Sequence, residues 1–385
     1  MSTPLLTRPF ALLVAGHFLQ ALGYSSMLLL PLYLDHLGAS NAQIGAIMGA
    51  GAVGGLLSRP AVGWALDTVG RRPTLVVGTA VLSLGMALVA AVTSTGPMAY
   101  AERVIFGAGQ GALFTAYFTF AADLVPASRR TEGIALFGVS GLLPLLVNPL
   151  TEQVGVDPAQ LRWFLPAVGC LVALSLPLVL ALPRPPRTQA GEPITLAAVL
   201  RSLRAPSVAP VWLATVIFSG VVATFMSFAT VAAGRRGIPS PTTLWLGYPL
   251  AAASVRLLGA RLPDRVGPAN VVAPAMLAYG VALVLVAGAT TLGDLLLAGL
   301  LAGLSHGYCF PVLVAQVVDR VPSTHRGSGV AMFTALWGVS EIVVSPLLGA
   351  FADAWGHAAM FALAATVATA AMAVWAALEH RLAPR

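Results

Sequence analysis

The sequence predicts an all-α membrane protein with about twelve transmembrane helices, arranged as two six-helix bundles that are parallel repeats of each other. Of its 385 residues, 58% are hydrophobic and 9% are charged, against roughly 25% charged in an ordinary soluble domain. The apolar residues occur in repeated runs of about 20, the length that crosses a hydrocarbon core of roughly 30 Å. Two segments of the first half also recur in the second half at nearly the same offset.

Charged residues and Gly/Pro turns separate the apolar runs and set the limits of the helices. The first run is too long for a signal-peptide core and is read as a permanent helix. We expect one bundle over residues 1–182, a cytoplasmic linker rich in proline and arginine over 183–207, and a second bundle over 208–385. The predicted spans are 9–34, 41–66, 74–94, 98–124, 131–154, 160–182, 208–233, 241–260, 270–290, 292–318, 327–352 and 357–378.

The positions of the arginines predict the orientation in the membrane. Most of them fall on connections that share one side if the N-terminus is inside, whereas the opposite side has only Arg162, Arg235 and Arg236. This asymmetry is the positive-inside pattern, and an even number of helices then places both termini in the cytoplasm.

Composition also excludes several classes of function. The net charge is +7, but the basic residues are scattered between apolar runs instead of forming one basic face, so nucleic acid is not an expected partner. Cys170 and Cys309 lie inside apolar runs, which favours packing over a disulfide or metal site. The sequence contains no nucleotide-binding loop and no catalytic or metal-ligand constellation, so we expect no cofactor, no metal and no enzyme activity.

The internal repeat is clearest on the predicted cytoplasmic connections. Residues 122–137 match residues 318–333 without a gap at an offset of 196, sharing Asp, Val, Pro, Arg, Gly, Ala and Phe. At an offset of 197, Arg59, Asp67, Val69 and Gly70 align with Arg256, Asp264, Val266 and Gly267. Two matches at nearly one offset predict two units of the same orientation, related by an axis along the membrane normal.

The connection after the second span contains Gly63, Asp67, Gly70, Arg71 and Arg72. This segment resembles motif A of the major facilitator superfamily, although Ala65 and Thr68 depart from the pattern. Glycine permits close helix approach and a tight turn, and an aspartate can accept from the free N–H groups at the start of a facing helix.

The resemblance implies that this facing helix begins near residues 326–329 and that Asp67 contacts it in the outward-facing state. Asp264 would make the equivalent contact near Thr131. The alternative is an ordinary helix-turn-helix flanked by positive-inside arginines.

The fourth span contains Arg103 followed by Gly107, Gly109 and Gly111, a pattern that resembles motif B of the same superfamily. An arginine inside a membrane span normally faces a partner or a watery cavity. Counting from the helix ends places Arg103 and Glu152 at similar depth, so we expect them to pair or to share a proton-linked network. The alternative is that Arg103 reaches toward the headgroups.

The fifth span departs from motif C of the drug:proton antiporters. It has Gly138, Gly141 and Pro144 but lacks the Gly-Pro pair of that motif. This departure weakens the antiporter assignment and leaves the superfamily resemblance intact.

Glu341 is the deepest acidic residue and our preferred proton carrier, since burial of a lone carboxylate favours its neutral or paired form. Phe333, Trp337, Glu341 and Ser345 recur every four residues and therefore share one helix face. The alternative is a structural Glu341 that is hydrogen-bonded between helices. His306, in the middle of the tenth span, either joins Glu341 in proton transfer or acts as an interhelical hydrogen-bond donor.

The predicted substrate-binding residues are polar or aromatic side chains inside the spans. By resemblance, the first, fourth, seventh and tenth helices of the superfamily surround the central path. Phe218, Phe225, Trp245 and Tyr248 either line an apolar pocket or pack in the core. The predicted binding set is His17, Gln20, Tyr24, Gln110, Asn148, Phe310 and Trp337.

The resemblance implies a monomeric, alternating-access transporter in the bacterial inner membrane, with a small-molecule substrate, protons and the lipid bilayer as its partners. Our leading hypothesis is proton-coupled efflux of a small organic, amphipathic compound. Transport of a sugar or another polar metabolite is the first alternative. A lipid flippase or exporter on the same fold is the second, and a membrane enzyme is the last.

Overall fold

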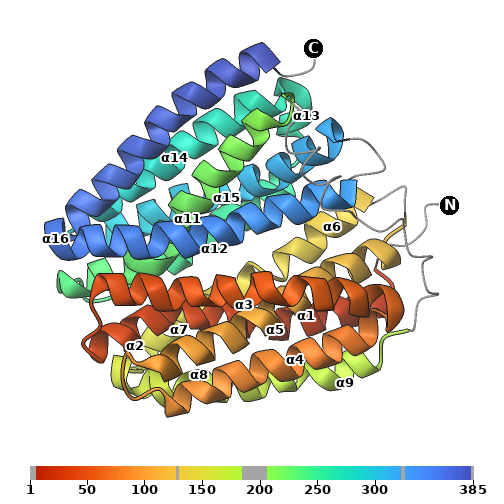
Figure 1. Ribbon diagram of the computed structural model, residues 1–385, viewed down its shortest axis with the longest axis horizontal. Helices are drawn as coiled ribbons and strands as arrows, with labels where there is room; N and C mark the ends of the chain where they lie inside the picture. The colour runs from red at the N-terminus through yellow and green to blue at the C-terminus, as the bar shows by residue number, and fades with distance from the viewer. Residues whose placement is uncertain (1–5, 127–129, 184–205, 322–325, 383–385) are drawn as a thin grey trace. The chain divides into compact units, whose positions relative to one another are not determined.

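The computed structural model describes residues 6–126, 130–183, 206–321 and 326–382, and every regular element in these ranges is a helix (Figure 1). The chain divides into two compact units. The first comprises Met1–Ala39 and Ile47–Ala190, and the second comprises Ser40–Ala46 and Gly191–Arg385. The predicted first bundle contained residues 40–46, whereas their contacts group these residues with the second unit.

The first unit contains the helices of the first six predicted spans. The fifth span is interrupted around Gly141 and Pro144, where the chain turns and forms a 3₁₀ segment, because proline cannot donate to the helical ladder. The elements are α1 (Arg8–Ser26), η1 (Met27–Leu29), α2 (Leu30–His36), α3 (Asn41–Thr68), α4 (Arg71–Leu88), η2 (Val89–Ala91), α5 (Pro97–Leu124), α6 (Arg130–Val139), η4 (Leu143–Leu146), α7 (Val147–Gln153), η5 (Pro158–Gln160), α8 (Leu161–Ala173) and α9 (Ser175–Leu180).

The second unit contains the helices of the other six predicted spans. Its last helix joins two predicted spans, and Figure 1 shows it as two arms that meet at a sharp bend. The bend is at Gly356, whose φ of +81° is readily adopted only by glycine. The elements are α11 (Ala209–Arg235), η6 (Pro241–Thr243), α12 (Leu244–Leu258), α13 (Leu262–Val266), α14 (Pro268–Gly288), α15 (Leu292–Arg320) and α16 (Arg326–Leu382).

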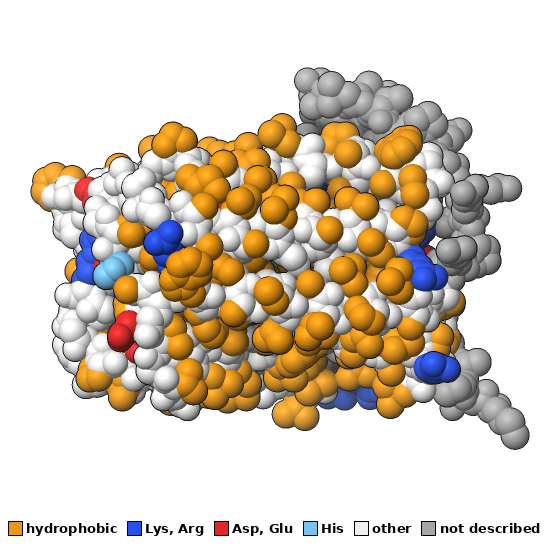
Figure 2. All heavy atoms as spheres, turned by 90° about the horizontal axis from the view of Figure 1, so that it is seen from below, with side chains coloured by type: hydrophobic (Ala, Val, Ile, Leu, Met, Phe, Trp, Pro, Cys, Tyr) orange, Lys and Arg blue, Asp and Glu red, His pale blue; other side chains and the backbone are white. Residues whose placement is uncertain are grey.

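Length and apolar character suit these helices to a bilayer. Within the described residues, 8 helical segments are long and apolar enough to cross a membrane, and the two arms of α16 count among them as one. Figure 2 shows a face whose middle is covered by hydrophobic side chains, with Arg, Asp and Glu near its two ends. Charge at the ends and apolar surface between them is the distribution that a membrane-spanning protein requires.

Glycines hold the same pairs of helices together in both units. An added Cβ at Gly107 of α5 would lie 1.8 Å from the carbonyl oxygen of Gly51 in α3. An added Cβ at Gly303 of α15, 196 positions later, would lie 2.1 Å from the carbonyl oxygen of Tyr248 in α12. Only glycine permits such close backbone contact, so the repeat extends from the connections into the helix packing. At Gly63 an added Cβ would meet none of the described residues within 4 Å, so the close approach expected there stays a prediction.

Each unit also contains an ion pair between helices. In the first unit, Arg71 Nε lies 3.0 Å from a carboxylate oxygen of Asp123, with the two side chains 12% and 30% exposed. In the second unit, Arg320 Nη1 donates to Glu379 Oε2 at 2.9 Å, and these side chains are 8% and 10% exposed. The second pair is therefore the better shielded one.

Candidate functional site

The segment from Gly63 to Arg72 comprises the end of α3, a tight turn at Val69 and Gly70, and the start of α4. Gly70 has φ +108°, and Gly267, at the repeat-related position, has φ +91°. Each precedes the first residue of a helix, α4 and α14 respectively, so both turns require a conformation that favours glycine. The turn geometry is thus repeated in the two units.

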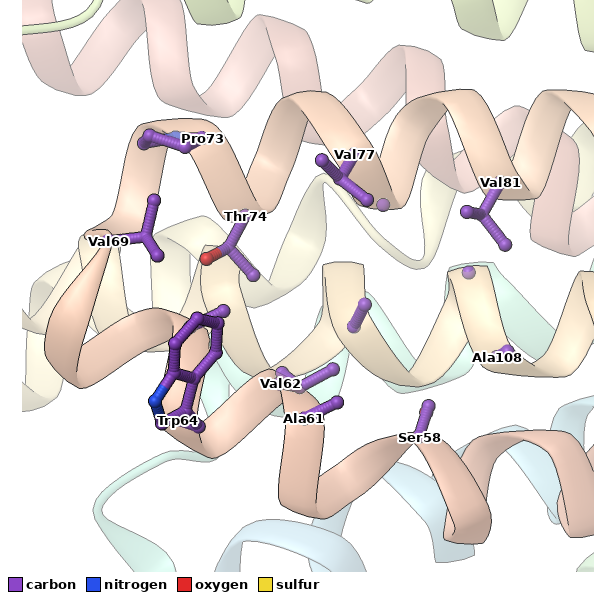
Figure 3. Close-up of a pocket in the computed structure, with 14 residues that line it drawn as sticks. Ser58, Ala61, Val62, Trp64, Val69, Pro73, Thr74, Val77, Val81 and Ala108 are labelled. Carbon is purple, nitrogen blue, oxygen red and sulfur yellow. The ribbon is translucent and has the colours of Figure 1, made fainter.

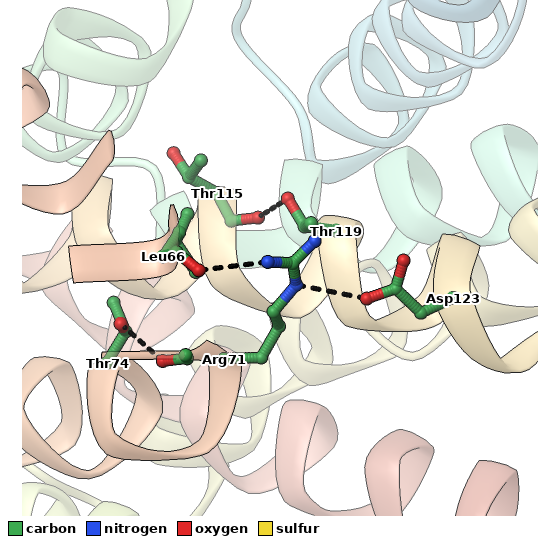
Figure 4. A network of polar contacts seen from close by, with 7 residues as sticks. Leu66, Arg71, Thr74, Thr115, Thr119 and Asp123 are labelled. Atoms are coloured by element: carbon green, nitrogen blue, oxygen red, sulfur yellow. Dashed lines mark hydrogen bonds and ion pairs between the residues drawn. The ribbon is translucent and has the colours of Figure 1, made fainter. Parts of the chain in front are cut away.

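Arg71 links this turn to α5 (Figure 4). Its Nε donates to Asp123 at 3.0 Å and its Nη1 donates to the backbone carbonyl of Leu66 at 2.9 Å. The arginine therefore ties the end of α3 and the start of α4 to the last turn of α5. Sequence reasoning named Arg71 but not Asp123, although Asp123 is one of the residues repeated in the second half, as Asp319.

Asp67 and Asp264 are both exposed, and Arg72 is half-buried. The helix starts that they were expected to contact involve Arg326 and Thr131, whose side chains lie outside those that the structure describes. The helix-cap contacts of Asp67 and Asp264 therefore stay predictions.

In the first unit, His17 of α1 lies in an aromatic cluster. Its Nδ1 is 2.7 Å from the hydroxyl of Ser140, and its ring stacks on Phe137 at 4.3 Å between centroids. Tyr117 and Phe118 of α5 complete the cluster at 5.1 and 6.2 Å. His17 is only 6% exposed, so this predicted binding residue presents little surface to a solute.

The other predicted binding residues of the first unit lie on α1, α5 and α7. Gln20 Nε2 donates to Gln110 Oε1 at 2.7 Å, which joins α1 to α5. Tyr24, one turn beyond Gln20, is half-buried. Asn148 is fully buried, and neither polar atom of its amide has a hydrogen-bond partner. An unsatisfied buried amide costs roughly 1–3 kcal/mol and is therefore a position where a ligand or water gains by binding.

Arg103 is 5% exposed on α5 and its guanidinium lies over the ring of Phe106 at 4.9 Å. Its Nε and Nη1 are buried without hydrogen-bond partners, so the expected pairing with Glu152 is not formed through these atoms. Glu152 itself is half-buried on α7. The acid beside Arg103 in the chain, Glu102, is 1% exposed and was not predicted as a site residue.

In the second unit, His306 is the centre of a larger aromatic cluster. Its Nδ1 lies 2.6 Å from the hydroxyl of Tyr248. Its ring stacks on Phe310 at 5.8 Å and meets Phe218 edge-on at 5.5 Å and Trp337 tilted at 5.9 Å. The structure thus brings together His306, Phe310 and Trp337, which were predicted separately, and adds Tyr248 as the hydrogen-bond partner.

The cluster around His306 has a buried wall and an accessible wall. Phe218, Phe225, Trp245 and Tyr248 are fully buried, as expected of core residues. His306, Phe310 and Trp337 are half-buried. Glu341 lies one turn beyond Trp337 on α16 and is also half-buried, so the predicted proton carrier lies beside the accessible wall.

Arg256 of α12 adds a positive charge to this region. It acts electrostatically on both Tyr248 and His306, and its Nε is buried without a hydrogen-bond partner. Sequence reasoning found Arg256 only as the repeat-related partner of Arg59.

Asp353 makes a contact that sequence reasoning missed altogether. One carboxylate oxygen accepts from the backbone N–H and the side-chain amide of Asn41 at 2.8 Å each, and the other accepts from the N–H of Ala42 at 2.9 Å. Arg235 also donates to the Asn41 side chain at 3.0 Å. A carboxylate from α16 therefore caps the start of α3.

An apolar groove lies between α3, α4 and α5, with a volume of about 390 Å³ (Figure 3). Its hydroxyl-bearing residues, Ser58 and Thr74, use their hydroxyls on the backbone of their own helices. None of the predicted binding residues lines it, so it is separate from the polar and aromatic clusters. Its lining is Ser58, Ala61, Val62, Trp64, Ala65, Val69, Pro73, Thr74, Val77, Gly78, Val81, Ala108, Gly109 and Ala112.

Comparison with known proteins identifies the family. The sequence model of the Major Facilitator Superfamily matches residues 13–268 and 242–385. The chain belongs to the major facilitator superfamily. It is a membrane transporter of that superfamily, and its relatives and fold neighbours are transporters rather than enzymes.

Bacterial relatives of the superfamily match over nearly the whole chain. The uncharacterized MFS-type transporter STM4428 of Salmonella typhimurium is 26% identical over 375 residues, which cover 90% of each chain. The uncharacterized MFS-type transporter YhhS of Escherichia coli is 29% identical over 364 residues, which cover 90% of this chain and 86% of YhhS.

Solved structures of the superfamily share the fold. The nucleoside transporter NupG matches with a TM-score of 0.80 at 15% identity, over 97% of this chain and 99% of NupG. A variant of the Escherichia coli fucose:proton symporter FucP matches with a TM-score of 0.66 at 19% identity, over 96% of this chain and 98% of FucP. The predicted fold class is therefore confirmed, whereas no antiporter branch is shown.

Proposed function

We propose that this transporter exports small organic, amphipathic compounds in exchange for protons. The observation that carries the proposal is the aromatic cluster around His306. Flat apolar surfaces next to a histidine–tyrosine hydrogen bond suit a ligand that has both an apolar body and a polar group. The protein would act by alternating access as a monomer in the bacterial inner membrane, with both termini in the cytoplasm.

Glu341 is the proposed proton carrier. It lies one turn from Trp337, so a change in its charge would be felt at the accessible wall of the aromatic cluster. Its position within a membrane-spanning helix makes the charged form costly, which favours a carboxylate that alternates between a protonated and a paired state. Arg103, Glu152 and His306 are proposed as the supporting groups.

The test is transport in proteoliposomes. Compounds that raise the thermal stability of the purified protein are selected first from a panel of drugs, sugars, amino acids and lipids, because ligands of the folded state raise apparent stability. A selected compound is then followed with and without a pH gradient. We expect the gradient to drive accumulation in the wild type and in the control variant Asp157→Asn, which changes an exposed residue.

The decisive variant is Glu341→Gln, which keeps the shape of the side chain and removes the titration. It should lose gradient-driven accumulation and retain exchange of labelled for unlabelled compound. Gradient-driven transport at the wild-type rate in Glu341→Gln would show that the proton is carried elsewhere. Gradient-driven uptake toward the side of the N-terminus would contradict export.

A polar-metabolite transporter is the second candidate, and Asn148 is the observation that favours it. Its buried amide has both a free donor and a free acceptor, which match the hydroxyl or ring nitrogen groups of a sugar or nucleoside. Stabilisation by sugars or nucleosides alone in the same panel, lost in Asn148→Leu, would favour this candidate over the first.

A further inference from the structure

We infer that the second unit contains a site for an aromatic organic anion, with the ring against His306, Phe310 and Trp337 and the anionic group at Arg256. The inference rests on the proposed function, since it names the chemical class of the transported compound. Three features of the second unit support it: an unpaired cation, its placement along α12, and the accessible aromatic wall.

The cation is Arg256. Its Nε is buried without a hydrogen-bond partner, and in the described residues it forms no ion pair. The groups on which it acts electrostatically are Tyr248 and His306, neither of which is a carboxylate. Arg256 as a whole is half-buried. A partly buried cation without a counter-ion is costly, and an anion that binds beside it recovers part of that cost.

Helix packing holds α12 against α15, the helix of His306 and Phe310, up to the residue before Arg256. Tyr248 and Val255 of α12 lie against Gly303 and Gly307 of α15, respectively, so the two helices stay in close contact along this stretch. Arg256 follows Tyr248 by eight residues, which is about 12 Å along the axis and about 80° around it. The long arginine side chain can cover about half of this distance, so a ring with a short acidic arm can reach its guanidinium.

The aromatic wall fits the ring of such a compound. Phe310 is stacked beside His306, and Trp337 meets Phe310 edge-on at 5.6 Å. All three side chains are half-buried, so each still presents surface. Ring faces and edges held in fixed orientation favour a planar partner over a flexible chain.

The repeat-related positions of the first unit keep the cation, since Arg59 aligns with Arg256, but they differ in two of the ring residues. The counterpart of His306 is Gln110, which is already bonded to Gln20, and the counterpart of Trp337 is Gly141. The first unit therefore lacks both the histidine and the indole of this site, although Phe114 stands at the position of Phe310. The anion site belongs to the second unit alone.

Binding to a matched series of ligands tests the inference. The full chain in phosphatidylcholine nanodiscs is titrated with 3-phenylpropionate, its neutral amide and 3-phenylpropylamine, which share the ring and differ in charge. Tryptophan fluorescence and thermal shift report binding. We expect the carboxylate to bind at least tenfold tighter than the amide, and the amine to bind more weakly than the amide.

Variants then assign the charge and the ring. Arg256→Gln should bind carboxylate and amide equally, Arg256→Lys should keep part of the preference, and the exposed control Arg261→Gln should keep all of it. Trp337→Leu should weaken the carboxylate and the amide to the same extent. Equal binding of the carboxylate and the amide by the wild type would overturn the inference. An unchanged preference for the carboxylate in folded Arg256→Gln would also overturn it.

Two further experiments distinguish this site from a lipid-headgroup site and from the export proposal. Nanodiscs that contain phosphatidylglycerol test a lipid headgroup as the source of the anion, and complete displacement of 3-phenylpropionate by this lipid would overturn the assignment to a ring-bearing solute. Carboxylate binding without gradient-driven transport would refute proton-coupled export and leave the site standing. Gradient-driven transport confined to neutral or cationic compounds would refute the site and leave the export proposal standing.

Discussion

His17 and His306 each bond a hydroxyl and stack on a phenylalanine, but they lie in surroundings of different accessibility. His17 bonds Ser140 and is enclosed by rings from α5 and α6, with 6% of its surface exposed. His306 bonds Tyr248 and shares a half-buried wall with Phe310 and Trp337, in the field of Arg256. A duplicated scaffold has therefore produced one sealed cluster, suited to holding helices together, and one accessible and charged cluster, suited to binding.

The histidines are not repeat-related, which sharpens the contrast. The position of His306 is occupied by Gln110 in the first unit, and Gln110 bonds Gln20 on α1, the helix that also carries His17. The glycines beside these positions are retained, since Gly107 and Gly111 correspond to Gly303 and Gly307. Backbone packing is thus common to both units, whereas the side chains that carry chemistry differ.

The largest expected effect concerns the two ion pairs. Glu379→Gln removes one partner of a pair that is about nine-tenths buried, and we expect it to lower the free energy of unfolding by about 3–5 kcal/mol. Asp123→Asn breaks the more exposed pair and should cost at most about 1 kcal/mol. Thermal and denaturant unfolding in detergent measures both. Equal losses would show that the two units shield their ion pairs alike.

The glycine contacts should come next. Gly107→Ala and Gly303→Ala each place a Cβ about 2 Å from a carbonyl oxygen of the neighbouring helix, which should cost about 3 kcal/mol, the upper end for overpacking. Gly63→Ala is the control, because its Cβ would meet nothing within 4 Å and alanine is the better helix former by up to about 1 kcal/mol. A stable Gly303→Ala paired with an unstable Gly107→Ala would show that the packing of the two units is not equivalent.

Exchange of each histidine for phenylalanine tests the functional contrast directly. His306→Phe keeps the ring stacking and removes the polar contact at the accessible wall, so we expect affinity for an aromatic carboxylate to fall about tenfold, the worth of one hydrogen bond of about 1.4 kcal/mol. His17→Phe should change affinity less than about twofold, because His17 is buried in the first unit, away from the proposed site. Ligand-dependent thermal stabilisation reads out both. A larger loss in His17→Phe would place binding in the first unit.

The smallest effect is expected at the helix cap. Asp353→Asn weakens three hydrogen bonds to Asn41 and Ala42 and should cost about 1 kcal/mol, as the loss of a helix cap does. Asp157, which stands 196 positions earlier, caps only the short η5, and asparagine is an equally good N-cap, so Asp157→Asn should change stability by less than about 0.5 kcal/mol. Amide hydrogen exchange at the start of α3 should rise in the first variant only.

Hydropathy and charge were enough to predict the helices, because bilayer thickness fixes span length and the arginines mark the span ends. The repeat was predicted from the residue matches between the two halves. Even the short turn between residues 270–290 and 292–318 was found, and the structure ends α14 at Gly288 and begins α15 at Leu292. The bend of α16 at Gly356 lies between the predicted spans 327–352 and 357–378, whereas the interruption of the fifth span near Pro144 was not predicted. Proline and glycine mark positions where a helix can bend, but their surroundings decide whether it does.

Side-chain partners were harder to predict than helices. Arg103 and Glu152 were matched by depth, which leaves the rotation of each helix undetermined, so their shared network stays a prediction. The contact that the structure gives the guanidinium of Arg103 is with the ring of Phe106. Tyr248 and Asp353 were missed as partners for the same reason, since they come from helices distant in sequence from His306 and Asn41. In helices that are apolar on nearly every side, the pattern of residues does not reveal which side faces which neighbour.

The assignment of Ser40–Ala46 to the second unit has a consequence for dissecting the protein. Gly349 of α16 has no room for a Cβ beside Asn41, and Gly45 has none beside Ser345, so the first turns of α3 are fitted to α16. A fragment of residues 1–182 would contain all of α3 but would lack α16, against which the first turns of α3 pack. These turns would therefore have no packing partner in a separated N-terminal fragment. We expect the two half-length fragments to recover native structure only when they are made together.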